Sequence, residues 1–166
     1  MIESKRIRSD NEALKFIQES QNIKKRSTAL YFHFAKVSVS EPEIHDLLMA
    51  ITKDEASHAT EFGTAVGWLH LTQEETRVNL SKAPKIYSFI DEKLAVDYAD
   101  TTELLRVATL LELKMEEVFS SVVGTFSNEK CNDLFLRILL GDNKHYDALN
   151  TAYKRLAESK QSYVGG

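Results

Sequence analysis

The sequence predicts an all-α protein: a four-helix bundle in which two antiparallel helical hairpins are joined by a long crossover that contains a short helix. Only 6 Gly and 2 Pro occur among the 166 residues, so few positions disfavour helix. Apolar residues recur at spacings of three and four rather than two, as on the buried face of a helix. Capping and turn residues then divide the chain into two long pairs of helices.

The first hairpin begins at the capping residues Ser-Asp-Asn-Glu of positions 9–12, and its first helix runs toward Val39. Proline suits the first turn of a helix, so Glu-Pro-Glu at positions 41–43 predicts the turn into the second helix. The inner stripe of the first helix consists of Leu14, Ile17, Thr28, Tyr31 and Ala35. The inner stripe of the second helix consists of Ile44, Leu48, Ile51, Phe62, Val66 and Leu69.

The segment 71–100 is too long for a tight turn between helices and is predicted to be the crossover. It contains a capping box at residues 72–75 and a short helix over residues 84–98. A third helix begins near Asp100, and Ser-Asn at positions 127–128 makes the turn into a fourth. The inward residues are Leu104, Ala108, Leu111, Met115, Phe119, Val122 and Phe126 on the third helix, and Phe135, Ile138, Leu149, Ala152 and Leu156 on the fourth.

The chain is expected to form one domain over residues 1–166, with the bundle at about residues 10–158 and a loose tail at 159–166. The formal net charge of -4, from 21 Lys and Arg against 25 Asp and Glu, argues against nucleic acid as a partner. No apolar run approaches the ~20 residues that cross a bilayer, and the segment MIESKRIRSD carries charges where a signal peptide is apolar. We therefore expect a cytoplasmic protein that binds neither nucleic acid nor a membrane.

Two acid-x-x-His pairs interrupt the apolar stripes: Glu55 with His58 on the second helix, and Asp142 with His145 on the fourth. On a helix this spacing leaves two side chains about 60° apart around the axis and about 4.5 Å apart along it, so both can reach one ion. Glu55 and Asp142 follow their turns by nearly the same number of residues, which places the two pairs at one depth. Counting back through the turn from Asp142 reaches Glu112 on the third helix, at the same depth.

Three buried carboxylates at one level need a cation, mutual hydrogen bonds or a lysine, because a buried acid without a partner is costly or becomes neutral. Carboxylate oxygens and imidazole nitrogens together suit iron, manganese or zinc. The candidate metal ligands are Glu55, His58, Glu112, Asp142 and His145.

With these motifs on its second and fourth helices, the chain resembles the ferritin-like, rubrerythrin-type di-iron carboxylate proteins over roughly residues 10–158. The resemblance implies that Glu55 and Asp142 bridge two metal ions and that His58, His145 and Glu112 are terminal ligands. It implies one or two iron ions, with manganese or zinc as the alternatives.

The only cysteine is Cys131, so the rubredoxin module of full rubrerythrins, which needs paired cysteines, is missing. If the protein is redox-active, an external electron donor has to supply the electrons. We also expect a homodimer.

The first helix departs from the family pattern. Counting back from Glu55 reaches Lys25 where the family has a carboxylate; one turn earlier is Asn22, and the nearest acid is Glu19. Three arrangements stay open: Glu19 reaches the site through a shift of one turn, water fills the position, or Lys25 neutralises Glu55 and displaces one metal ion.

The apolar stripe of this helix passes close to Lys24 or Lys25, so one of the two lysines can point inward. Our hypothesis assigns this role to Lys25. Its charge would compete with an ion beside Glu55, leaving the side of His145, Asp142 and Glu112 as the better metal position.

The expected function is a metal-binding, rubrerythrin-like oxidoreductase of the peroxidase or ferroxidase type. It would oxidise Fe(II) with peroxide or oxygen, in oxidative stress or iron handling. The alternative is a degenerate, non-catalytic four-helix bundle that acts as a protein-binding module.

Overall fold

The structure is a computed structural model that describes residues 6–72 and 83–164. Within these ranges the chain folds into helices and contains no β-strand beyond one isolated bridge between Arg8 and Phe126. The all-α class predicted from the sequence is confirmed. The capping box predicted at 72–75 lies outside the described residues from position 73 on. No helix of the described ranges is both long enough and apolar enough to cross a membrane.

The first two helices begin at the residues that the sequence predicts. α1 (Asp10–Val37) follows Ser9, whose hydroxyl accepts a hydrogen bond from the backbone N–H of Glu12 at 3.3 Å. α2 (Pro42–Ala65) has proline in its first turn and continues into a short 3₁₀ helix, η1 (Val66–Trp68). The serine cap satisfies a backbone N–H that has no partner inside the first turn, and proline needs none there.

The remaining helices are α3 (Ala83–Leu94), α4 (Thr101–Ser120) and α5 (Glu129–Val164). The carboxylate of Asp100 caps α4 by accepting a hydrogen bond from the backbone N–H of Thr102 at 3.0 Å. α4 therefore begins next to the predicted start of the third long helix, and α3 begins as predicted but ends at Leu94, four residues before the predicted end of the short helix.

The structure also corrects the ends of α4 and α5. α4 stops before Val122 and Phe126, which lie past the helix although both are buried as expected. Gly124 has a φ of 75° in this connection, a left-handed conformation that costs glycine little. α5 stays helical to Val164, whereas a loose tail was expected from residue 159.

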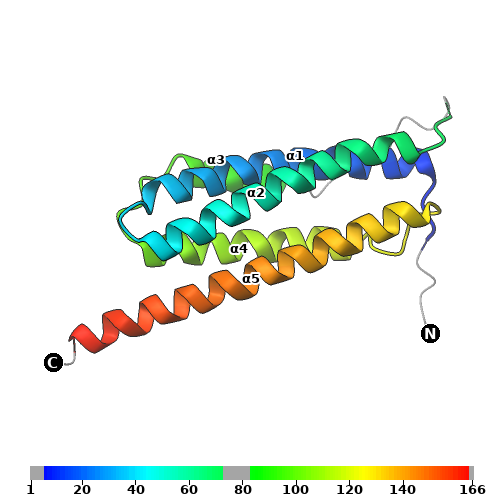
Figure 1. The fold of residues 1–166 in the computed structure, drawn as a ribbon. Helices are drawn as coiled ribbons and strands as arrows, with labels where there is room; N and C mark the ends of the chain where they lie inside the picture. The colour runs from blue at the N-terminus through cyan, green and yellow to red at the C-terminus, as the bar shows by residue number, and fades with distance from the viewer. Residues whose placement is uncertain (1–5, 73–82, 165–166) are drawn as a thin grey trace.

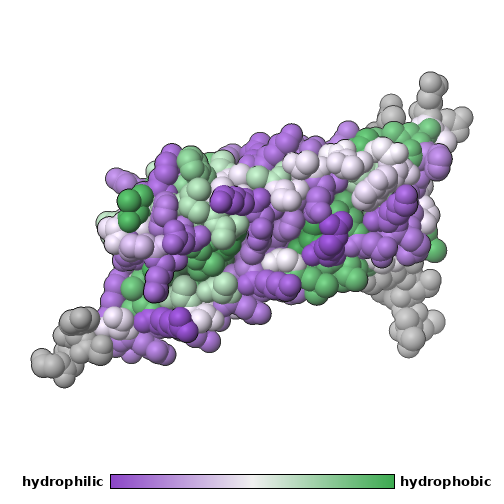
Figure 2. Space-filling model, viewed as in Figure 1, coloured by the Kyte–Doolittle hydropathy of each residue, from purple (hydrophilic) through white to green (hydrophobic). Residues whose placement is uncertain are grey.

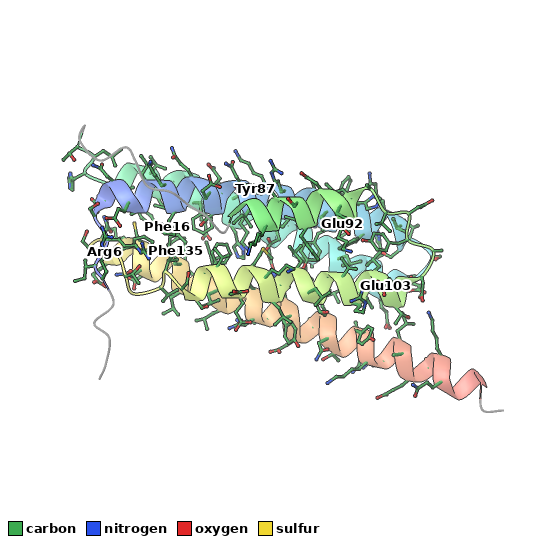
Figure 3. The ribbon with its side chains drawn as sticks, turned by 180° about the vertical axis from the view of Figure 1, so that it is seen from behind. Arg6, Phe16, Tyr87, Glu92, Glu103 and Phe135 are labelled. Atoms are coloured by element: carbon green, nitrogen blue, oxygen red, sulfur yellow. The ribbon has the colours of Figure 1, made fainter. Side chains whose placement is uncertain are left out.

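The helices are arranged as two antiparallel pairs that lie side by side (Figure 1). α1 packs along α2, α4 packs along α5, and α2 also contacts α5. α3 lies in the connection between the pairs and packs on α1 and α4 (Figure 3). The C-terminal end of α5 extends past the other helices (Figure 1).

An apolar core fills the space between the pairs. Near the start of α1, Phe16 packs edge-on against Phe126, which packs on Phe135 with ring centroids 5.0 Å apart. Figure 3 shows Phe16 and Phe135 between the helix pairs at this end. The fully buried inward residues include Ile17, Tyr31, Phe34, Leu48, Phe62, Leu104, Leu111, Met115, Phe119, Ile138 and Leu149. Polar side chains interrupt this core in its middle, and these form the candidate site.

Candidate metal centre

Four potential metal ligands from three helices meet inside the core. Glu55 comes from α2, Glu112 from α4, and Asp142 and His145 from α5; none is more than 7% exposed. One ligand atom of each residue lies within 4.8 Å of the other three. This carboxylate–histidine group can therefore hold a metal ion. All four residues were predicted from the sequence.

A buried lysine stands between two of these carboxylates. Nζ of Lys24, on α1, lies 2.9 Å from Oε1 of Glu55 and 2.6 and 2.8 Å from the two oxygens of Asp142. The lysine side chain is 0% exposed. Its Nζ also lies 3.8 Å from Sδ of Met115 and 5.2 Å from the ring centroid of Phe119. Lys24 is thus the residue of α1 that faces the carboxylates.

The other candidates on α1 face elsewhere, which corrects the assignment to Lys25. Lys25 and Asn22 are exposed. Glu19 accepts a hydrogen bond from the hydroxyl of Tyr87 on α3 instead of reaching the group. The prediction that a lysine of this helix points inward is therefore correct, but the lysine is Lys24 and not Lys25.

A signal for Lys24 is present in the sequence. Ile17, Lys24 and Tyr31 follow one another at intervals of seven, which is about two helical turns, and all three are buried. Counting back through the turn missed this register by one residue, because Lys24 and Glu55 are 31 residues apart whereas Glu112 and Asp142 are 30 residues apart.

Lys24 and Glu55 form an ion pair in the core. Burial alone would lower the pKa of Lys24, but the charges of Asp142 and Glu55 raise it above its ordinary value, so the ammonium group stays charged. Burial likewise opposes ionisation of Glu55, yet the charge of Lys24 and several hydrogen bonds hold the pKa of Glu55 well below its usual range. One of these hydrogen bonds comes from the hydroxyl of Ser27, also on α1.

One lysine cannot neutralise three carboxylates, and burial raises the pKa values of two of them, Asp142 and Glu112. The pKa of Asp142 rises well above its ordinary value. Oε1 of Glu112 accepts a hydrogen bond from the hydroxyl of Tyr31 at 2.6 Å. Oε2 of Glu112 has no hydrogen-bond partner among the described residues. This end of the group therefore favours a further cation or a proton.

His145 turns one ring nitrogen outward and one inward. Its Nε2 lies 2.9 Å from Oδ2 of Asp54 at the surface. Its Nδ1 lies 3.5 Å from Glu112, 3.6 Å from Glu55 and 3.8 Å from Asp142, and has no hydrogen-bond partner within the described chain. Burial lowers the pKa of His145, but Glu112 and Asp54 outweigh it and raise the pKa to about 9. Metal-ligating histidines commonly have one nitrogen held by a carboxylate in this way.

His58, the fifth predicted ligand, lies beside the carboxylate–histidine group and not within it. Its Nδ1 lies 3.5 Å from Oε1 of Glu55 and 3.8 Å from Oδ1 of Asp142, without a hydrogen-bond partner in the part of the chain described. The ring stacks on that of His145, with centroids 6.1 Å apart and planes 29° apart. The two imidazoles together cover the group.

A surface cleft between α2 and α5 reaches the two histidines. Its volume is about 580 Å³, and both His58 and His145 line it. Gly141 leaves room beside the ring of His58, because a Cβ at position 141 would lie 3.3 Å from Cε1 of that ring. Figure 2 shows this face of the molecule, where hydrophobic residues surface among polar ones between the two helices. Other lining residues include Leu136 and Leu140, both exposed.

Comparisons with known proteins do not identify a family: no family model matches the chain, and neither a curated protein nor a solved structure matches it. Its function has to follow from the site itself.

Sequence reasoning missed Ser27 and Asp54, whose contacts with Glu55 and His145 exist only once the helices have packed.

Proposed function

We propose that this protein is a ferritin-like four-helix bundle of the rubrerythrin type, with α1–α2 and α4–α5 as its hairpins and α3 in its crossover. In this proposal the core binds a redox-active metal ion of the iron type. The observation that carries it is the inward Nδ1 of His145, which is buried, unpartnered among the described residues and 3.5 to 3.8 Å from three carboxylates.

The donor set supports a transition metal. A nitrogen donor combined with carboxylate oxygens suits iron, manganese or zinc, whereas magnesium and calcium prefer oxygen donors alone. Two contacts from outside the group support the same reading. Tyr31 holds Glu112 and Asp54 holds His145, as outer partners orient ligands around a metal.

The proposed reaction is the oxidation of Fe(II) by peroxide or oxygen. Bound iron would supply the one-electron redox chemistry. The chain itself contributes the negative charge of the carboxylates, an aromatic core that limits water, and a cleft through which a small oxidant reaches His58 and His145. A homodimer and an external electron donor stay predictions.

The test is anaerobic reconstitution with Fe(II), a count of iron per chain, and then addition of hydrogen peroxide while Fe(III) formation is followed by absorbance. We expect the wild type to bind iron and oxidise it. His145→Phe should bind iron at least about tenfold more weakly because it removes a ligand nitrogen. The matched control is His70→Phe, since His70 is exposed and far from the group in sequence. Equal iron affinity in the two variants would contradict the proposal.

One observation favours a second candidate function. Lys24 satisfies Glu55 and Asp142 without any metal, as expected of a degenerate, non-catalytic bundle that binds another protein. Metal content separates the two candidates. A chain that takes up no iron, manganese or zinc after reconstitution would favour the protein-binding module.

A further inference from the structure

We infer that Lys24 is a built-in cation that limits this centre to one divalent metal ion, held on the side of Glu112 and His145. The inference rests on the proposed metal-binding function. It concerns how many ions the centre holds and where.

The hydrogen bonds of the group are distributed unevenly. The ammonium group of Lys24 has three N–H donors, and three carboxylate oxygens of Glu55 and Asp142 lie within 2.6 to 2.9 Å of it. The remaining oxygen of Glu55 accepts from Ser27. Every carboxylate oxygen of Glu55 and Asp142 therefore already accepts a hydrogen bond from α1.

Two unpartnered atoms lie at the other end of the group. Nδ1 of His145 and Oε2 of Glu112 are buried and have no hydrogen-bond partner within the described residues, whereas beside Glu55 and Asp142 the corresponding atom is Nδ1 of His58, and the carboxylate oxygens there are already bonded to α1. Nδ1 of His145 still lies within 3.6 Å of Oε1 of Glu55 and 3.8 Å of Oδ1 of Asp142. Each of these oxygens has a second lone pair that an ion can use. One ion near Glu112 and His145 can thus bind while Lys24 keeps its contacts.

Charge sets the same limit. Three carboxylates that are all ionised as metal ligands carry three negative charges, and the ammonium of Lys24 cancels one of them. One divalent ion cancels the other two and leaves the buried centre neutral. Two divalent ions beside the lysine would leave two positive charges in the core, which is costly in a medium of low polarity.

Lys24 is also poorly placed to withdraw in favour of a second ion. Its side chain is 0% exposed, and Sδ of Met115 and the ring of Phe119 also lie beside its ammonium. Leaving Glu55 and Asp142 would deprive a buried charge of the hydrogen bonds that these two carboxylates accept.

The test counts ions in the wild type and in two variants that make the same charge change one residue apart. Lys24→Glu replaces the inward lysine by a fourth carboxylate, and Lys25→Glu does the same at the exposed neighbour. Each protein is titrated anaerobically with Fe(II), and with Mn(II) for electron paramagnetic resonance. We expect one ion per chain in the wild type and in Lys25→Glu, with the signal of an isolated Mn(II). We expect two ions in Lys24→Glu, with the signal of a coupled pair.

The outcomes separate this inference from the proposed function. Two ions in the wild type, or one in folded Lys24→Glu, would overturn the inference and leave the metal-binding function standing. No ion in the wild type would overturn both.

Lys24→Met keeps the inference testable if Lys24→Glu does not fold. It removes the competing charge without adding a ligand, so we expect one ion bound at least about tenfold more tightly than in the wild type. Unchanged affinity in Lys24→Met would show that the lysine does not act as a cation of the centre, and would overturn the inference.

Discussion

Lys24 is the side chain on which the metal-free core depends most. Removing one partner of a buried ion pair leaves the other charge uncompensated, at a cost of about 3–5 kcal/mol. We therefore expect Lys24→Met to lower the free energy of unfolding of the metal-free protein by about 3 kcal/mol or more. Lys25→Met should change it by less than about 0.5 kcal/mol, because Lys25 is exposed. Urea denaturation measures both values, and equal losses in the two variants would contradict the central place of Lys24.

Protons and the metal ion compete for His145. Its pKa of about 9 means that the ring of the metal-free protein is protonated at neutral pH, whereas a metal ligand has to be neutral. Metal affinity should therefore rise as the pH increases from 6.5 toward about 9, and level off above it. Binding at pH 7 should release protons, which can be counted in a weakly buffered titration. An affinity that is flat or falls over this range would contradict this assignment.

The raised pKa of His145 also stabilises the metal-free fold, and this stabilisation decreases as the pH rises. The folded ring holds its proton more tightly than an unfolded one, so this contribution is complete below the ordinary histidine pKa of about 6.5. It is lost as the pH rises through about 9. The same proton underlies both effects: its loss removes this stabilisation of the metal-free fold and frees the ring nitrogen for an ion.

At the scale of elements, α2 and α5 line the cleft that reaches His58 and His145. Gly141→Ala on α5 would place a Cβ 3.3 Å from Cε1 of His58, so the ring has to move from the position that it holds beside the group. We expect this variant to take up Fe(II) and react with peroxide severalfold more slowly, with the number of ions per chain unchanged. Stopped-flow absorbance measures both rates.

Gly67→Ala is the matched control, because a Cβ at Gly67 meets no atom within 4 Å. Alanine inside a helix is about 1 kcal/mol more favourable than glycine, so slower reaction in Gly141→Ala would not reflect a weakened α5. Equal rates in Gly141→Ala and Gly67→Ala would show that reactants enter by another route.

At the scale of the whole molecule, the centre joins α1, α2, α4 and α5 through their side chains. An ion that binds only the folded chain raises its stability, by about 2.7 kcal/mol when the free ion is at a hundredfold its Kd. Removing the metal with a chelator should therefore lower the thermal unfolding midpoint. His145→Phe should show a much smaller difference with and without metal. An unchanged midpoint after confirmed metal loss would show that the centre is not coupled to folding.

Much of the fold and most of the candidate site could be predicted from the sequence, because the signals involved are local. Ser9, Pro42 and Asp100 mark helix starts by chemistry that acts within one turn. The acid-x-x-His pairs share a helix face by spacing alone, and the count through the turn from Asp142 placed Glu112 beside them correctly.

Only the tertiary structure decided which residue of α1 faces the carboxylates, where His58 lies, and that a cleft reaches the histidines. One residue along a helix turns the side chain by about 100°, so an error of one position exchanges a buried side chain for an exposed one. Lys24 and Lys25 differ by this step, and the packing of α1 against α2 decides which of them faces inward. Contacts such as those of Asp54 with His145 and of Ser27 with Glu55 join different helices, so packing alone brings them together.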